Sequence, residues 1–300
     1  MTAAGNPAIT GVGRPIVGGR RFSLNWVGAV PFLAYVAIFL ALPTAIIVGG
    51  AFANDSGFTL QNFANLSRPD VVASIYGSVI LSAVTATGGA LLGALLTYAI
   101  ATGNPRGTFR RVVTSACGVL AQFGGVTLAF AFIAAYGPAS AVYLYLSTHG
   151  LDYYPNGAVW LYDLRGLAFV YLYFQIPLMV LVFLPAVDGI KPQWREATDS
   201  LGGGTWHYWR YIAGPLLAPA FLGSALLLFA NALSAYATAA ALINQGGPIL
   251  PLQISNAISS EVGLHEPGFA KAQAVVLIVI VAVVSVLYAV LQRRTARWLQ

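Results

Sequence analysis

Charged side chains are so sparse in this chain that the intervals between them constrain the fold more than any motif does. Only 8% of the 300 residues are Asp, Glu, Lys or Arg, whereas a soluble globular domain carries about 25%. Six intervals without these residues are each long enough for the roughly 20 apolar residues of a membrane-spanning helix. They are 22–54, 71–105, 112–151, 166–187, 211–260 and 272–292. The spacing therefore predicts an all-α integral membrane protein.

Polar residues, glycines and prolines narrow these intervals to six predicted transmembrane helices. The predicted spans are 26–52, 74–102, 112–135, 166–187, 213–243 and 271–291. Residues 136–147 follow a Gly-Pro break, and we expect them to form a short interfacial or re-entrant element, not a seventh crossing. The transmembrane domain is predicted to cover residues 24–298, after a flexible tail of residues 1–23.

The basic residues predict the orientation. Twelve of the fifteen precede the first span, follow the sixth, or lie between spans two and three or four and five. The exceptions are Arg68, Arg165 and Lys271. By the positive-inside rule the side with twelve is cytoplasmic, so we expect a multi-pass protein of the plasma (inner) membrane with both termini in the cytoplasm. The net charge of +6 then reflects orientation, and no nucleic-acid partner is expected.

Several classes of catalytic site are excluded. A P-loop needs a Gly-Lys pair, but Lys191 and Lys271 follow Ile190 and Ala270. The three histidines lie in three separate loops, so we expect no metal site and no cofactor in this chain, and we do not expect an enzyme. No predicted span carries a charge in its interior, which disfavours an ion-coupled carrier. A stand-alone channel or secondary carrier is kept as the alternative from another class.

The predicted cytoplasmic loop 188–212 is rich in local signals. Pro192 suits the first turn of a helix, and the glycines at 202–204 suit its end. Thr205 is a good N-cap for a second short helix that leads into the fifth span at Pro215. The loop is thus predicted to form two helices joined by a glycine turn.

This loop resembles the EAA loop of permease subunits in binding-protein-dependent ABC importers. The residues that match the family spacing are Glu196, Ala197, Gly202, Ile212 and Pro215. The chain departs from the pattern at Thr198, where the family has a second alanine, and at Gly214, where leucine is common. The six-span arrangement over about 24–298, with this loop before the fifth span, is similar to the type I importer permease fold.

The resemblance implies that the loop is a coupling helix that docks on an ATPase subunit. The implied docking residues are Glu196, Ala197, Thr198 and Gly202, with support from Trp194, Arg195 and Trp206. The implied partners are two ATP-binding subunits, which carry ATP and Mg, a second permease subunit in a heterodimer or homodimer, an extracytoplasmic substrate-binding protein, and the lipid membrane.

The segment 231–258 and the C-terminal VLQRRTARWLQ resemble the polyamine-type (spermidine/putrescine-like) branch. Sugar, phosphonate or iron permeases of the same fold are the alternatives. Polar side chains within spans tend to face a cavity or the bundle interior, or to form helix–helix hydrogen bonds. The candidates for lining the pathway are Gln175, Asn231, Ser234, Tyr236 and Thr238.

Overall fold

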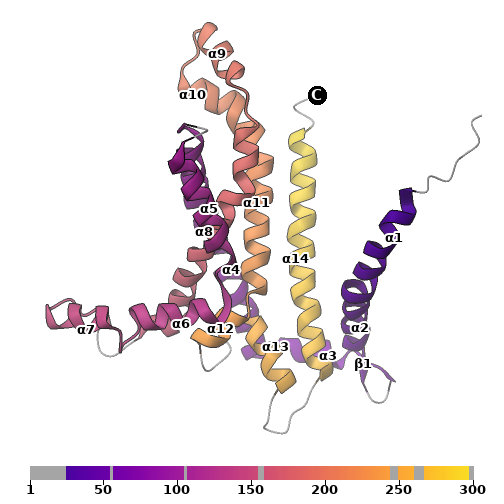
Figure 1. Ribbon diagram of the computed structural model, residues 1–300. Helices are drawn as coiled ribbons and strands as arrows, with labels where there is room; N and C mark the ends of the chain where they lie inside the picture. The colour runs from indigo at the N-terminus through magenta and orange to yellow at the C-terminus, as the bar shows by residue number, and fades with distance from the viewer. Residues whose placement is uncertain are drawn as a thin grey trace, which may run out of the picture. The chain divides into compact units, whose positions relative to one another are not determined.

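The computed structural model describes residues 25–54, 57–104, 107–154, 159–243, 249–259 and 267–296 (Figure 1). The predicted tail 1–23 lies outside these residues. The chain divides into two units after Ile46. The first contains α1 (Asn25–Val36), the π-helix η1 (Ala37–Ala41) and the start of α2 (Leu42–Ala51).

The second unit holds the remaining elements. A minimal hairpin, β1 (Ala53–Asn54) and β2 (Gly57–Phe58), pairs Ala53 with Phe58 in antiparallel register. Then come α3 (Gln61–Ala64), η2 (Asn65–Ser67), α4 (Pro69–Ala101), α5 (Thr108–Gln122), α6 (Gly125–Tyr136), α7 (Ala141–Thr148), η4 (Trp160–Tyr162), α8 (Leu164–Asp188), α9 (Pro192–Ser200), α10 (Thr205–Tyr208), the π-helix η5 (Trp209–Ala213), α11 (Gly214–Ser234), α12 (Ala237–Leu242), α13 (Leu250–Ser259) and α14 (Pro267–Ala296). In Figure 1 the long helices α4, α8, α11 and α14 run alongside one another. Helices α9 and α10 lie at one end, and α3 and α13 lie at the other.

Helices α4 and α8 pack closely against each other, and small residues of α4 allow the contact. A Cβ atom at Gly93 would lie 2.4 Å from the Cβ of Met179, and one at Gly89 would lie 2.9 Å from the Cβ of Gln175. The Nε2 of Gln175 donates a hydrogen bond of 3.1 Å to the Oγ1 of Thr85. Close backbone approach with an interhelical hydrogen bond is the usual basis of helix association in membranes.

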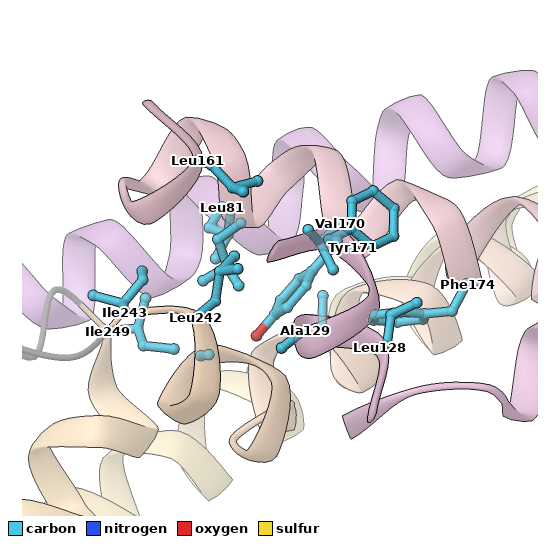
Figure 2. Packing of buried hydrophobic residues seen from close by; sticks show 14 of the residues in the cluster. Leu81, Leu128, Ala129, Leu161, Val170, Tyr171, Phe174, Leu242, Ile243 and Ile249 are labelled. Carbon is cyan, nitrogen blue, oxygen red and sulfur yellow. The ribbon is translucent and has the colours of Figure 1, made fainter. Parts of the chain in front are cut away.

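Figure 2 shows the largest apolar cluster, to which α4, α6, α8 and α12 all contribute. Its centre is Tyr171 of α8, which is fully buried and donates from its hydroxyl to the carbonyl oxygen of Ala235 at 2.6 Å. At the rim, the hydroxyl of Tyr154 donates to the carbonyl oxygen of Tyr136, also at 2.6 Å. Burial, with Tyr153 and other nearby tyrosines, raises the pKa of Tyr154 to about 12, so this hydroxyl keeps its donor proton at neutral pH.

Among the residues that the structure describes, six helical stretches are long and apolar enough to cross a membrane, and the all-α prediction is confirmed apart from the small hairpin. The third stretch differs from the predicted span 112–135, because the structure breaks that span between α5 and α6. Gly125 adopts a positive φ of 71°, and its N–H donates to the Oγ1 of Thr238 at 3.0 Å. The candidate span here is Gly125–Thr148, which comprises α6, a turn and α7. The interfacial or re-entrant placement of 136–147 stays a prediction.

The predicted fifth span, 213–243, is also interrupted. Helix α11 ends at Ser234 and α12 begins at Ala237. The carbonyl of Ala235, at the break, accepts the hydrogen bond from Tyr171 described above. Both interruptions therefore have backbone groups satisfied by side chains from distant helices, as apolar surroundings demand.

Candidate functional site

Helix α9 begins and ends as the sequence predicts. Lys191 is its N-cap and Pro192 its first residue. At the other end Gly202 has a φ of 75°, with its N–H bonded to the carbonyl of Asp199 at 3.0 Å. The N–H of Gly203 bonds to the carbonyl of Thr198 at 2.9 Å. These two bonds define a Schellman motif, which closes the carbonyl end of the helix with a left-handed glycine.

The start of α10 differs from the prediction by one residue. Gly204 is the N-cap, and Thr205 is the first helical residue, so the N-cap role predicted for Thr205 is wrong. Its Oγ1 instead accepts a hydrogen bond of 3.2 Å from the guanidinium of Arg195. The guanidinium carbon of Arg195 also lies 5.6 Å from the centre of the Tyr208 ring. Arg195 therefore ties α9 to α10.

Thr198 and Trp194 lie on the side of α9 that packs inward. Thr198 is buried, and its Oγ1 donates to the carbonyl of Trp194 at 2.8 Å. A Cβ atom at Gly203 would lie 2.8 Å from the Cγ2 of Thr198. The small residue at 198 thus allows the glycine turn to fold back on α9, and it is not on the outer surface.

The exposed surface of this segment carries the other predicted docking residues. Glu196, Ala197 and Gly202 are exposed, and the exposed fraction of Trp206 is 74%. Next to them Leu201, which the sequence did not single out, is 89% exposed. A charged, a small and two large apolar side chains are therefore exposed on this segment at the end of the bundle.

A cleft of about 470 Å³ separates α9 from the ends of α4 and α8. Glu196 and Asp199 line it from α9, and Tyr98 and Val187 line it from the bundle. The ring of Tyr98 meets the ring of Trp209 edge-on, with centroids 5.4 Å apart. Aromatic contacts thus join the segment to α4, and the side of α9 that bears Glu196 stays accessible.

Two more features attach the segment to the bundle. Arg110 at the start of α5 forms an ion pair with Asp188, the last residue of α8. The π-helix η5 leads into α11, and a Cβ atom at Gly214 would lie 2.5 Å from the carbonyl oxygen of Trp209. This crowding accounts for glycine at 214 where the related pattern has leucine. No local sequence signal links Arg110 to Asp188, because they are 78 positions apart.

The five pathway candidates do not come together. Gln175 is fully buried and bonded to Thr85, and Thr238 is buried and accepts from the N–H of Gly125. Asn231 and Ser234 are exposed on α11, three residues apart, so they share one face. Tyr236 is partly exposed, and its hydroxyl lies 2.9 Å from the Oγ of Ser255. Only the last three reach the surface of the chain.

The described residues contain no group of three or more His, Cys, Asp or Glu side chains that could hold a metal ion. The site therefore consists of an exposed, rigidly capped helical segment and a set of polar side chains on α11 and α12.

Solved structures share this fold. The chain superposes on a bacterial ABC transporter involved in the import of the acidic polysaccharide alginate with a TM-score of 0.71 at 17% identity, covering 90% of this chain and 95% of that one. The alginate ABC transporter in complex with its alginate pentasaccharide-bound periplasmic protein gives 0.73 at 18% identity, covering 90% and 94%. The MetNI methionine ABC transporter, in inward-facing conformations, gives 0.57 at 13% identity, covering 75% and 95%.

A sequence relative is the thiamine transport system permease protein ThiP of Escherichia coli (strain K12). It is 29% identical over 87 residues, which span 29% of this chain and 16% of ThiP. The model of one family, described as binding-protein-dependent transport system inner membrane component, matches residues 138–297. That match covers more than half of the chain and includes α8 to α14 with the segment 188–212. The chain therefore belongs to the family of binding-protein-dependent transport system inner membrane components.

Proposed function

We propose that this chain forms half of the membrane pathway of an ATP-driven importer, and that the segment 188–212 docks on an ATPase subunit. The observation that carries the proposal is the exposed surface of α9 and its glycine turn in a chain of this family. Ala197 and Gly202 allow a close approach of backbones, Glu196 offers a charge-assisted hydrogen bond, and Leu201 and Trp206 offer apolar area. Thr198 acts indirectly, by holding α9 on α10.

A movement of the ATPase would reach the bundle through the contacts that attach this segment. The Schellman turn fixes α9 relative to α10, and the Tyr98–Trp209 contact and the Arg110–Asp188 ion pair connect the segment to α4, α5 and α8. Two ATPase subunits, which bind ATP and Mg, would drive the cycle from the cytoplasmic side. In this orientation both termini are cytoplasmic.

The exposed polar residues of α11 support a second permease subunit as partner. Asn231 and Ser234 lie within a candidate span and are exposed in the single chain. A polar side chain in a membrane faces a protein partner or a cavity, not lipid. A second permease, identical or different, would cover this face and enclose a pathway. An extracytoplasmic binding protein would deliver the substrate to that pathway.

A small polar solute such as a polyamine is the proposed substrate. The likeness of 231–258 to polyamine permeases supports it, whereas the similar proteins named above concern thiamine, alginate and methionine. The described pathway candidates carry no carboxylate for a cation, so we assign selectivity mainly to the binding protein. Thermal-shift measurements on that protein with putrescine, spermidine, thiamine, methionine and oligosaccharides test this assignment; protection by a non-polyamine alone would exclude it.

The docking proposal is tested by placing a bulky charge on the exposed face of α9. Ala197→Arg should abolish co-purification of the ATPase and substrate-stimulated ATP hydrolysis while the chain stays folded. Thr108→Arg is the matched control, because Thr108 is exposed at the start of α5 and lies outside the segment. Retention of the ATPase by Ala197→Arg, or transport by the lone chain in liposomes without nucleotide, would overturn the proposal.

A further inference from the structure

A polar cavity of about 470 Å³ borders the first turns of α14, at the end of the bundle opposite α9 (Figure 1). Its walls come from the end of α2, the β1–β2 hairpin, α3, η2 and α14. The side chains that face it include four amides and one ammonium group, namely Asn54, Gln61, Asn62, Asn65 and Lys271. No carboxylate lines it among the residues that the structure describes.

Lys271 has an unusual position for a cation. It lies inside the candidate span Pro267–Val290, and it is one of the three basic residues that the charge distribution places away from the cytoplasm. A Cβ atom at Gly50 would lie 2.7 Å from its Nζ, so the glycine leaves room for the ammonium group. Within the described chain Lys271 has no ion-pair or hydrogen-bond partner. An ionisable side chain within a candidate span is a candidate functional group.

The amides form the wall around this ammonium group. The Nδ2 of Asn62 donates to the carbonyls of Ala51 at 3.0 Å and Ala53 at 3.3 Å, which fixes the hairpin to α3. The same Nδ2 lies 2.7 Å from where a Cβ of Gly268 would be, so α14 lies directly against it. The side-chain amides of Gln61 and Asn65 have no hydrogen bond within the described chain and are free to donate into the cavity.

The surroundings of the cavity suit the level of lipid headgroups. Phe58 and Leu60 beside it are 80% and 60% exposed, and the ring of Phe58 stacks on Phe52 with centroids 6.0 Å apart. Exposed apolar side chains of this kind are suited to the membrane boundary, where aromatic residues are enriched. The guanidinium carbon of Arg68 lies 5.3 Å from the ring centre of Phe269, which lines the cavity.

We propose that this cavity binds the phosphate group of a membrane phospholipid. Lys271 pairs with the phosphate oxyanion, and Gln61 and Asn65 donate hydrogen bonds to its oxygens. Basic pockets bind anionic headgroups in this way, and hydrogen bonds to an ionised acceptor are the strong ones. The acyl chains lie in the bilayer beside Phe58 and Leu60. The bound lipid then joins the hairpin and α3 to α14. In the proposed orientation the lipid belongs to the outer leaflet.

The experiment measures the thermal unfolding of the purified, delipidated chain as phosphatidylglycerol, inorganic phosphate or diacylglycerol is added. Phosphatidylglycerol should raise the unfolding midpoint, and diacylglycerol, which lacks the phosphate, should not. Lys271→Met should weaken the apparent affinity for phosphatidylglycerol about fivefold, and Lys271→Arg should restore it. Arg165→Met is the matched control, because Arg165 is an exposed basic residue in the first turn of α8 and should leave the affinity unchanged.

Other outcomes distinguish a phospholipid from a free anion or a binding-protein carboxylate at this cavity. Equal protection by inorganic phosphate alone would identify a free anion and overturn the lipid assignment. Unchanged lipid affinity in Lys271→Met would overturn the proposal. If the variant keeps its lipid affinity but loses contact with a carboxylate of the binding protein, Lys271 serves that protein and the lipid proposal is overturned as well. If Lys271→Met fails to fold, the double variant Gln61→Ala/Asn65→Ala gives the same readout, and it should lose affinity while leaving the ATPase attached.

Discussion

Helices α8 and α14 are both long and apolar enough to cross a membrane, yet the chain uses them differently. More than half of the most apolar window of α8 is buried, whereas almost none of that of α14 is, although α14 is the more apolar of the two. Buried α8 contains Gln175 and Pro177. The difference arises on the neighbouring helix, because α4 offers α8 the glycines at 89 and 93.

Apolarity thus places a helix in the membrane but does not decide how much protein covers it. Lipid tails are as apolar as leucine, so burial of apolar surface does not drive one helix against another there. Close backbone approach and interhelical hydrogen bonds decide instead. Within the second unit, most of the surface of α14 has no protein cover.

The largest expected effect comes from removing the close approach. Gly93→Leu places a side chain where even a Cβ would meet Met179 at 2.4 Å and the carbonyl oxygen of Ile176 at 2.8 Å. Overpacking costs about 1–3 kcal/mol, and more against backbone, so we expect loss of folded protein in fluorescence-detected size-exclusion chromatography. Ala282→Leu, a similar enlargement on exposed α14, should elute as wild type. Equal elution of both variants would show that the fold does not depend on the close approach between α4 and α8.

A smaller effect is expected at the hydrogen bond between α4 and α8. Thr85→Val keeps the shape but removes the acceptor of the Gln175 amide, which then stays buried without that partner. We expect a loss of about 1 kcal/mol, measured as a lower thermal unfolding midpoint. Ser285→Ala in α14 is the control, because the Oγ of Ser285 bonds only to Val281 of its own helix. A midpoint in Thr85→Val no lower than in Ser285→Ala would show that the bond adds nothing.

The smallest effect concerns α14 itself. The hydroxyl of Tyr288 donates to the carbonyl of Pro219 at 2.9 Å and lies over Gly223, which joins α14 to α11. Tyr288→Phe should cost about 0.5 kcal/mol, visible as a small decrease in the same midpoint. A loss larger than that of Thr85→Val would mean that α14 depends on protein contacts more than its exposure indicates.

The sequence predicts the features that depend on neighbouring residues alone, namely the long apolar helices and the ends of α9. Desolvation excludes charges from spans, so charge-free intervals located α4, α8 and α14. Pro192 and Gly202 marked the ends of α9, because the fixed φ of proline and the left-handed φ of glycine act within one turn. The resemblance at 188–212 is likewise visible in the sequence, since that pattern is contiguous.

Distant contacts were beyond such rules. The break before Gly125 depends on Thr238, 113 positions away, and composition treated 112–135 as one apolar run. The burial of Thr198 depends on how the glycine turn folds back, so a small residue there was assigned to an outer contact. For the same reason the sequence could not separate Gln175 and Thr238 from Asn231, because all three are polar and only the fold gives the first two their partners on distant segments.

The π-helix at Trp209–Ala213 has a consequence for reading this chain against its relatives. A turn closed between residues five apart holds one residue more than an α-helical turn, which corresponds to about 100° of rotation. A helical wheel that assumes an uninterrupted α-helix from α10 through α11 would therefore place each side chain beyond Ala213 on the wrong face of the helix. Comparisons of pathway faces along α11 should begin their count at Gly214.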